Sequence, residues 1–107
     1  MDAAAIEEIF QSVAPVTIKK FFGGKGVYAQ GVIIGCEFEG EMLLKADAIS
    51  APQFEAAGCK QWSYGHNKSG KQVKMPYWSI PESAFDDADE MAKWVRLGLD
   101  AGVRAKK

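Results

Sequence analysis

The stretch Phe21-Phe22-Gly23-Gly24-Lys25-Gly26-Val27-Tyr28 combines three aromatic residues with three glycines. Aromatic side chains favour burial, whereas glycine permits backbone angles and close backbone approaches that other residues tolerate poorly. Apolar residues alternate with other residues before this stretch, from Val16 to Phe22, and again after it, from Val27 to Ala29. The stretch therefore predicts a tight turn between two strands.

The segments that follow continue the same two-residue period. Residues 32–38 form the strongest predicted strand, with Val32, Ile34, Cys36 and Phe38 expected on one side. A further short strand is expected over residues 42–45. Gln30-Gly31 and Glu39-Gly40 separate these strands and are typical of tight turns, because glycine supplies a positive φ. Residues 16–46 therefore predict an antiparallel meander of three or four strands.

Two helices are expected on either side of this meander. Ile6, Ile9, Phe10 and Val13 form one apolar stripe, with Asp2 as the N-cap. The second helix is predicted to start at Ser50. We expect Ser50 and Gln53 to form a capping box, Ile49 and Phe54 to form a hydrophobic staple, and Gly58 to end the helix.

The C-terminal half predicts a second hairpin and a long final helix. Residues 62–64 and 73–78 alternate, and Pro76 suggests an edge position or a bulge because it cannot donate a ladder hydrogen bond. Asp87 and Glu90 fit a capping box at the start of the last helix. Gly98 and Gly102 lie one turn apart on its apolar face and suggest close approach to the sheet. The predicted fold class is α+β, with helices on one face of an antiparallel sheet.

Composition restricts the classes of function. The 107 residues are 48% hydrophobic and 25% charged, which is typical of one globular domain spanning residues 1–107. The net charge of −1 lacks the basic excess of most nucleic-acid-binding proteins. No secretory segment or apolar run of membrane-spanning length is present, so we expect a cytoplasmic protein with no membrane association and with reduced thiols.

Two glycine motifs resemble phosphate-binding loops. Gly24-x-Gly26-x-x-Ala29 loosely matches a dinucleotide fingerprint, and Gly65-x-x-x-x-Gly70-Lys71 matches most of a Walker A loop. Both motifs require a helix immediately afterwards, so that the phosphate meets the helix N-terminus. Strand patterns follow here, and Gln72 replaces the hydroxyl residue that would hold Mg²⁺. We interpret both stretches as turns and predict no cofactor.

The remaining reactive residues are isolated from one another in the sequence. His66 lies in a polar loop, Cys36 on the apolar side of a strand, and Cys59 just after a helix. A general base or a nucleophile needs an adjacent partner group, and none is visible beside these residues. The acidic residues at 86–90 lack the spacing of a calcium-binding loop and fit helix capping. We therefore predict no catalytic residues, no metal site and no enzymatic activity.

Several segments together resemble the N-terminal domain family of the competence regulators TfoX and Sxy. The residues that carry the resemblance are Phe22-Gly23-Gly24-x-Gly26-x-Tyr28, Leu44-Lys45-x-Asp47, Phe54-x-x-Ala57-Gly58 and Met75-Pro76-Tyr77-Trp78, together with the amphipathic C-terminal helix. The similarity extends from about residue 6 to residue 103, in matching order and spacing. Phe21 departs from the family pattern, which has Met before Phe-Gly-Gly.

The resemblance implies a two-layer α/β sandwich of α-β(3)-α-β(2)-α type, similar to secretion chaperones. It also implies a role in regulating transcription of competence genes, through contacts with a transcription factor or the transcription machinery. The second, helix-hairpin-helix domain of full-length family members has no counterpart in these residues, so a DNA contact made by that domain is not carried over. The family implies no catalytic residues.

We therefore expect a bacterial protein-interaction module. Aromatic residues concentrate on the second hairpin, and some of them are expected to form an exposed patch. The expected partner surface comprises Phe21, Phe22, Gly23, Gly24, Gly26, Tyr28, Lys45, Met75, Pro76, Tyr77 and Trp78. Trp78→Ala or Gly24→Val is expected to abolish partner capture.

Two other modes of interaction stay open. The first is a homodimer that forms through the strand containing Pro76. The second is direct, low-specificity nucleic-acid binding through a local lysine patch, which the net charge disfavours. That patch would comprise Lys19, Lys20, Lys25, Lys68, Lys71 and Lys74.

Overall fold

The computed structural model describes residues 1–21, 23–66 and 71–106, without the side chains of residues 64–66, 71 and 72. Phe22 and the tip of the second predicted hairpin lie outside this description. The elements in chain order are α1 (Ala3–Ile9), the 3₁₀ helix η1 (Gln11–Val13), β1 (Thr17–Phe21), β2 (Gly24–Ala29), β3 (Val32–Phe38), β4 (Glu41–Lys45), α2 (Ala51–Ala56), β5 (Gln61–His66), β6 (Lys71–Ser79), the 3₁₀ helix η2 (Glu82–Asp86) and α3 (Ala88–Lys106).

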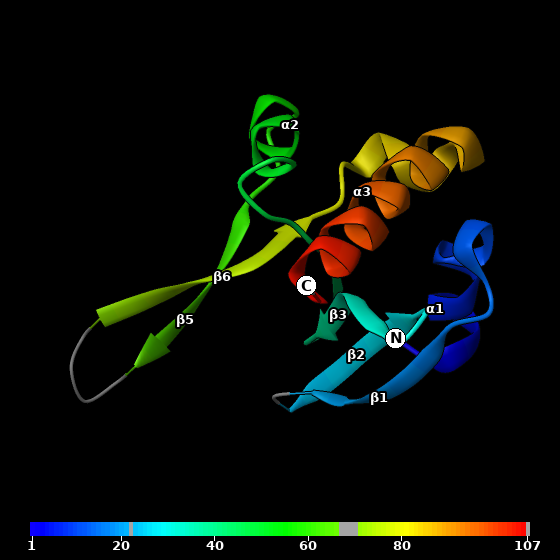
Figure 1. The fold of residues 1–107 in the computed structure, drawn as a ribbon, viewed down its shortest axis with the longest axis horizontal. Coiled ribbons are helices and arrows are strands. Elements are labelled where there is room, and N and C mark those ends of the chain that lie inside the picture. The colour runs from blue at the N-terminus through cyan, green and yellow to red at the C-terminus, as the bar shows by residue number, and fades with distance from the viewer. Residues whose placement is uncertain (22, 67–70, 107) are drawn as a thin grey trace.

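All six strands form one open antiparallel sheet in the order β1-β2-β3-β4-β6-β5. The helices lie on one face of this sheet, and α3 crosses β3 and β4 (Figure 1). The predicted α+β fold is thereby confirmed. Four strands precede α2, rather than the three in the order that the resemblance implied, because the glycine stretch divides residues 17–29 into β1 and β2.

The predicted turns lie between the strands of the meander. Gln30 and Gly31 have φ of 53° and 80°, and Glu39 and Gly40 have φ of 53° and 85°. Two successive positive φ values define the two-residue turns whose twist suits a β-hairpin. Gly23, with φ of 80°, marks the first turn, but the other glycines of that stretch belong to β2. The predicted start of this strand at Val27 was therefore too late.

The strict alternation predicted for residues 32–38 is wrong at one point. A β-bulge leaves Ile34 as an extra residue, because Val27 pairs with Gly35 whereas Tyr28 pairs with Ile33. Ile34 consequently belongs to the main core under the helices, whereas Cys36 belongs to a separate cluster. The bulge changes which side chains reach each face of the sheet.

The main core lies between the sheet and the helices. Its largest fully buried side chains are those of Phe10 at the C-cap of α1, Ile6 of α1, Phe54 of α2, and Ile34 and Leu44 of the sheet. The ring of Phe54 packs against the ring of Trp94 with a centroid distance of 4.9 Å. The short helix α2 is thus anchored mainly by one aromatic side chain, as its length of about two turns requires.

The two glycines of α3 allow its backbone to approach the sheet closely. A Cβ atom added at Gly98 would lie 2.7 Å from the Ile34 carbonyl oxygen, and one at Gly102 would lie 2.5 Å from the Ile33 carbonyl oxygen. Both distances are too short for real atoms, and a backbone carbonyl cannot rotate away as a side chain can. The predicted close approach of α3 to the sheet is confirmed.

The helix caps follow the predictions at two of the three N-termini. Asp2 accepts a hydrogen bond from the Ala5 amide, and Asp87 accepts from the amides of Asp89 and Glu90. Glu90 does not complete a capping box, because its carboxylate accepts from the Ser83 hydroxyl and the Trp94 indole.

The predicted capping of α2 by Ser50 and the staple through Ile49 are both wrong. Ser50 makes no cap hydrogen bond to the helix, and Ile49 is 67% exposed. Asp47 organises this segment instead, accepting from the amides of Ile49 and Ser50. Its carboxylate also pairs with Arg104 of α3 through distances of 2.6 Å and 2.9 Å. These bonds join the β4–α2 connection to the last turn of α3.

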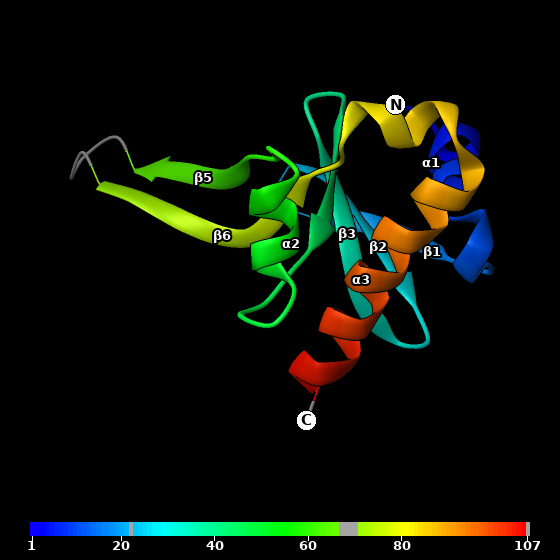
Figure 2. The same cartoon turned by 90° about the horizontal axis from the view of Figure 1, so that it is seen from above.

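The β5–β6 hairpin projects from the body of the molecule (Figures 1 and 2). β4 pairs with β6 only from Leu43 to Lys45, opposite residues 77–79, whereas β5 pairs with β6 as far as Lys71. A register irregularity opposite Pro76 confirms the predicted bulge. β6 lies between β4 and β5, so the edge position that Pro76 also suggested does not apply to residues 77–79. None of the helices in the described ranges has the length and apolar character that a membrane crossing requires.

Candidate functional site

A second apolar cluster lies on the face of the sheet that the helices leave uncovered. Three of its residues are buried, and four others pack against them with partial exposure. The buried residues are Cys36, Leu43 and Tyr77, and the partly exposed residues are Phe21, Ile33, Trp62 and Met75. We call these seven residues and Phe38, whose ring packs on Trp62, the aromatic cluster.

The sheet curves around the aromatic cluster. The ring centroids of Phe21 in β1 and Tyr77 in β6 are 5.8 Å apart, although β2, β3 and β4 separate the two strands. On a flat sheet, four strand spacings would place these strands about 19 Å apart. Phe38 in β3 likewise meets Trp62 in β5, with ring centroids 5.3 Å apart. Curvature therefore brings the two ends of the sheet together over a shared set of rings.

The glycines of the opening stretch make space for this cluster. A Cβ atom at Gly26 would lie 3.0 Å from the Tyr28 ring and 3.2 Å from Cβ of Phe21. A Cβ atom at Gly23 would lie 3.8 Å from the Phe38 ring, which is ordinary contact. Gly24 has a different role, because its added Cβ would lie only 2.0 Å from the Glu37 carbonyl oxygen in the neighbouring strand. The stretch thus combines ring packing with close strand pairing.

Two lysines lie over aromatic rings on this side of the sheet. The Lys45 ammonium nitrogen is 5.2 Å from the centroid of the Tyr77 ring, and the Lys19 nitrogen is 5.3 Å from that of the Tyr28 ring. Both distances fit cation–π attraction. Burial lowers the pKa of the Lys45 ammonium group. The surface therefore combines partly exposed rings with positive charge.

The reactive groups inside the cluster are held in their neutral forms. Burial raises the pKa of the Cys36 thiol to about 12, and the Glu37 carboxylate adds to this effect. Burial likewise raises the pKa of the Tyr77 hydroxyl. A thiol must ionise to act as a nucleophile, and Cys36 is only 1% exposed. This arrangement favours packing and binding over nucleophilic chemistry at these two groups.

The family model of the TfoX N-terminal domain matches residues 8–102 of this chain. The chain belongs to the TfoX N-terminal domain family. This is a regulatory family associated with competence and is not known as a family of enzymes. No curated protein matches the chain. The match includes the whole sheet, α2 and most of α3, so the aromatic cluster lies within the TfoX-type domain.

The TfoX-type fold brings together five of the residues expected at the partner surface. Phe21, Tyr28, Lys45, Met75 and Tyr77 lie on or beside the uncovered face. Tyr77 is only 4% exposed, so it supports the other rings more than it offers a contact surface. The glycines at positions 23, 24 and 26 lie in the adjoining turn and strand.

The other expected residues lie elsewhere. Trp78 packs against the main core, with its ring 6.2 Å from that of Phe54, on the helix-covered face. Pro76 is exposed, and its carbonyl oxygen accepts a hydrogen bond from the Ala46 amide. Phe22 falls outside the described residues. Trp78→Ala and Gly24→Val therefore test core packing and strand pairing before they test a surface.

The lysines of the nucleic-acid alternative do not share one side of the sheet where the structure describes them. Lys19 lies over Tyr28, and Lys20 follows it in β1, so the two side chains leave opposite faces. Lys25 donates a hydrogen bond to the Met1 carbonyl oxygen, and Lys74 is exposed on β6. Lys68 and the side chains of Lys71 and His66 lie outside the description.

Sequence reasoning missed Phe38 and Lys19 as members of this site. Phe38 follows the same alternation as Cys36, and its place before the Glu39-Gly40 turn was visible in the sequence. Its contact with Trp62 depends on the curvature of the sheet, which periodicity does not show. Among the residues that the structure describes, which include the acidic run at 86–90, no three or more His, Cys, Asp or Glu side chains are grouped so that they could hold a metal ion.

Proposed function

We propose that this domain is a non-enzymatic protein-interaction module of bacterial transcription regulation, and that the aromatic cluster is its partner surface. The single observation that supports this proposal best is the set of partly exposed rings on the uncovered sheet face, held in place by contacts with one another. Rigid aromatic side chains are enriched at the energetic centres of protein interfaces because they bury a large area at low entropic cost.

The positive charge on the uncovered sheet face further favours, as the partner, a protein with acidic groups around an apolar patch. Lys19 and Lys45 supply positive charge beside the rings, whereas the chain as a whole carries a net charge of −1. A transcription factor or a subunit of the transcription machinery is the class of partner that the family suggests. The small number of lysines on this face favours a protein over a nucleic acid.

A capture experiment with matched variants tests this proposal. The wild-type chain, Phe38→Ser and Lys45→Glu are compared as tagged baits in the native organism, with Ile49→Ser as the control. Ile49 is 67% exposed and lies outside the aromatic cluster, so its change removes a similar apolar group elsewhere. We expect at least one protein to be retained by wild type and control and reduced about tenfold or more by both Phe38→Ser and Lys45→Glu.

The captured protein is then purified and titrated against the same four chains, with circular dichroism confirming that each variant is folded. Equal affinity for wild type and Phe38→Ser would overturn the proposal. A salt-dependent shift of duplex DNA by the wild-type chain, lost on Lys19→Glu and Lys74→Glu, would favour the nucleic-acid alternative instead.

A second copy of the chain is the other candidate partner, supported by the projecting hairpin. Residues 71–75 of β6 extend beyond the pairing with β4 and have β5 as their strand partner, so one backbone edge faces away from the sheet. Val73 on this segment is 51% exposed. Exposed strand edges readily pair with further strands. Sedimentation equilibrium would show a dimer that weakens in Val73→Glu and persists in Ile49→Glu, whereas a wild-type monomer at about 100 μM contradicts this mode.

A further inference from the structure

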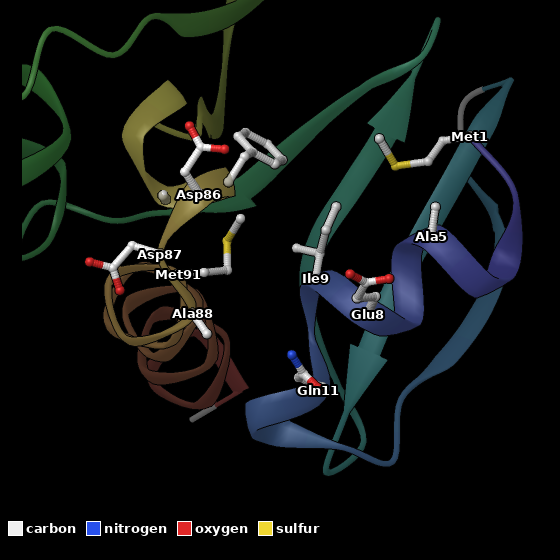
Figure 3. A pocket seen from close by; sticks show the side chains of 11 residues that line it. Met1, Ala5, Glu8, Ile9, Gln11, Asp86, Asp87, Ala88 and Met91 are labelled. Carbon is white, nitrogen blue, oxygen red and sulfur yellow. The ribbon is translucent and has the colours of Figure 1, made fainter.

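A cleft of about 460 Å³ lies between α1 and the segment formed by η2 and the start of α3 (Figure 3). Ile9 from α1 and Met91 from α3 face the space between the two helices. Phe85 of η2 also lines it. The cleft involves none of the residues of the aromatic cluster, so its properties are independent of the function proposed above.

The cleft concentrates exposed apolar surface. Phe85 is 53% exposed and Met1 is 40% exposed, and both belong to the small group of large apolar side chains that the described structure leaves in solvent. An aromatic side chain in a short 3₁₀ helix could turn toward the core, yet Phe85 lines the same cleft as Ile9. Contiguous apolar surface in a concave site is typical of a binding groove.

The charged side chains that line the cleft are all acidic. The side chains that line it include Glu8, Asp86 and Asp87 and no lysine or arginine. Asp87 caps α3 by accepting hydrogen bonds from the amides of Asp89 and Glu90, so one of its carboxylate oxygens already has protein partners. Glu8 and Asp86 are both exposed and make no such cap. Opposite charges on an occupant would therefore be complementary at two positions of the rim.

The backbone that surrounds the cleft favours a helical occupant. Every described lining residue after Met1 comes from α1, η1, η2, α3 or the junction between η2 and α3, and no strand edge lines the cleft. An extended segment would find no strand with which to pair, whereas a helix satisfies its own backbone hydrogen bonds. The half-exposed wall at Phe85 also makes the cleft more open than the pockets that enclose small ligands.

We propose that this cleft binds a basic amphipathic helix of a partner protein. Apolar side chains of that helix pack against Phe85, Ile9 and Met91, and its lysine or arginine side chains pair with Glu8 and Asp86. The apolar contacts supply most of the affinity, because exposed ion pairs contribute little individually. The carboxylates supply orientation and selectivity against acidic helices.

A synthetic peptide tests this proposal with the full chain. The probe is a fluorescein-labelled amphipathic helix of about 14 residues, roughly four turns, composed of leucine and lysine. The matched control peptide has glutamate in place of every lysine. Fluorescence anisotropy is expected to show binding of the lysine peptide with a dissociation constant on the order of 10–100 μM, and binding of the glutamate peptide at least about tenfold weaker.

Variants then locate the binding site. We expect Phe85→Ala to weaken binding of the lysine peptide about tenfold, and Glu8→Lys with Asp86→Lys to weaken it similarly and to reduce its salt dependence. Ile49→Ala and Glu41→Lys, which change an exposed apolar group and an exposed carboxylate elsewhere, should stay within about twofold of wild type. Amide chemical shifts on binding should change most over residues 5–11 and 84–91.

Three results would overturn the proposal. These are equal binding of both peptides, unchanged binding by Phe85→Ala and by the double charge reversal, and no binding of the lysine peptide at about 1 mM. Phe38→Ser, which changes the aromatic cluster, serves as a further control and should leave peptide binding unchanged. The two proposals can thus succeed or fail separately.

Discussion

The two faces of this sheet are covered in different ways. On one face, helices supply a main core in which Phe54 is fully buried and the α3 backbone touches the strands at Gly98 and Gly102. On the other face, the sheet curves until its own rings meet, and residues such as Phe21 and Phe38 stay partly exposed. One sheet thus has a buried core on one side and a partly exposed set of contacting rings on the other.

The largest expected contrast is between two phenylalanines on opposite faces. Phe54→Ala should lower the free energy of unfolding by about 3–5 kcal/mol, because it leaves a cavity beside Trp94 and Trp78. Phe38→Ala should lower it by only about 1–2 kcal/mol, since its ring is partly solvated already. Urea unfolding followed by circular dichroism measures both values, and equal losses would contradict the division into core and surface.

The two cysteines test whether the aromatic cluster excludes solvent. Cys36 is 1% exposed with its pKa raised to about 12, whereas Cys59 is partly exposed. At pH 8.5, iodoacetamide should modify Cys59 at least about 100-fold faster than Cys36 in the native protein. Peptide mass spectrometry measures both rates, with the chain unfolded in urea as the control. Similar native rates would show that the uncovered face opens readily.

The close approach of α3 predicts an unusual response to alanine. At a solvent-exposed position of a helix, a Gly→Ala change such as Gly98→Ala would stabilise the protein by about 1 kcal/mol through helix propensity. Here the added Cβ meets the Ile34 carbonyl oxygen, and overpacking of about 3 kcal/mol outweighs that gain. We expect a net loss of about 2 kcal/mol by urea unfolding. Ala105→Leu, on an exposed position of α3, should change stability by less than about 0.5 kcal/mol.

The smallest expected effect concerns the pair between Asp47 and Arg104. The guanidinium of Arg104 and two backbone amides hold the pKa of the Asp47 carboxyl well below its usual value of about 3.9. A lowered folded-state pKa contributes stability above that value and loses it as the pH falls toward the folded-state pKa. Wild type should therefore unfold at a higher temperature than Asp47→Asn at pH 7.

That difference in melting temperature should shrink as the pH falls below about 4. Both side chains of the pair are about one third exposed, so salt should reduce the difference as well. No difference at pH 7 would mean that Asp47 acts through its amide hydrogen bonds alone, because asparagine keeps an oxygen that can accept them. A difference that stays constant from pH 7 to pH 2 would contradict a role for the charge of Asp47.

Local sequence patterns predicted most of the elements because their causes are local. The turns at Gln30-Gly31 and Glu39-Gly40 need a positive φ, which neighbouring residues reveal without knowledge of the fold. The apolar stripe of α1 and the Asp2 and Asp87 caps depend on residues three or four positions apart. The segments that resemble the TfoX N-terminal domain also lie where the family model matches.

The residues of the candidate site depended on contacts between distant segments. The bulge at Ile34 places Ile34 and Cys36 on opposite faces of the sheet, and no sequence signal in that strand predicts it. Trp78 and Tyr77 are neighbours in the sequence, yet the first joins the helix-covered core and the second the uncovered cluster. The predicted cap at Ser50 failed because its hydroxyl bonds to Asp47 instead of to the helix: it accepts from the Asp47 amide and donates to the Asp47 carboxylate. Arg104, 57 positions away, holds the same carboxylate.

The stretch from Phe21 to Tyr28 shows the same division. By itself the sequence determined that the chain turns there, because Gly23 needs a positive φ and strand-forming residues lie on both sides. Only the tertiary structure decided what its other glycines do. Gly24 leaves room for the Glu37 backbone of the paired strand β3. Gly26 leaves room for the Tyr28 ring and for Phe21 and Ile33 of the two neighbouring strands, so both requirements arise mainly from strand pairing.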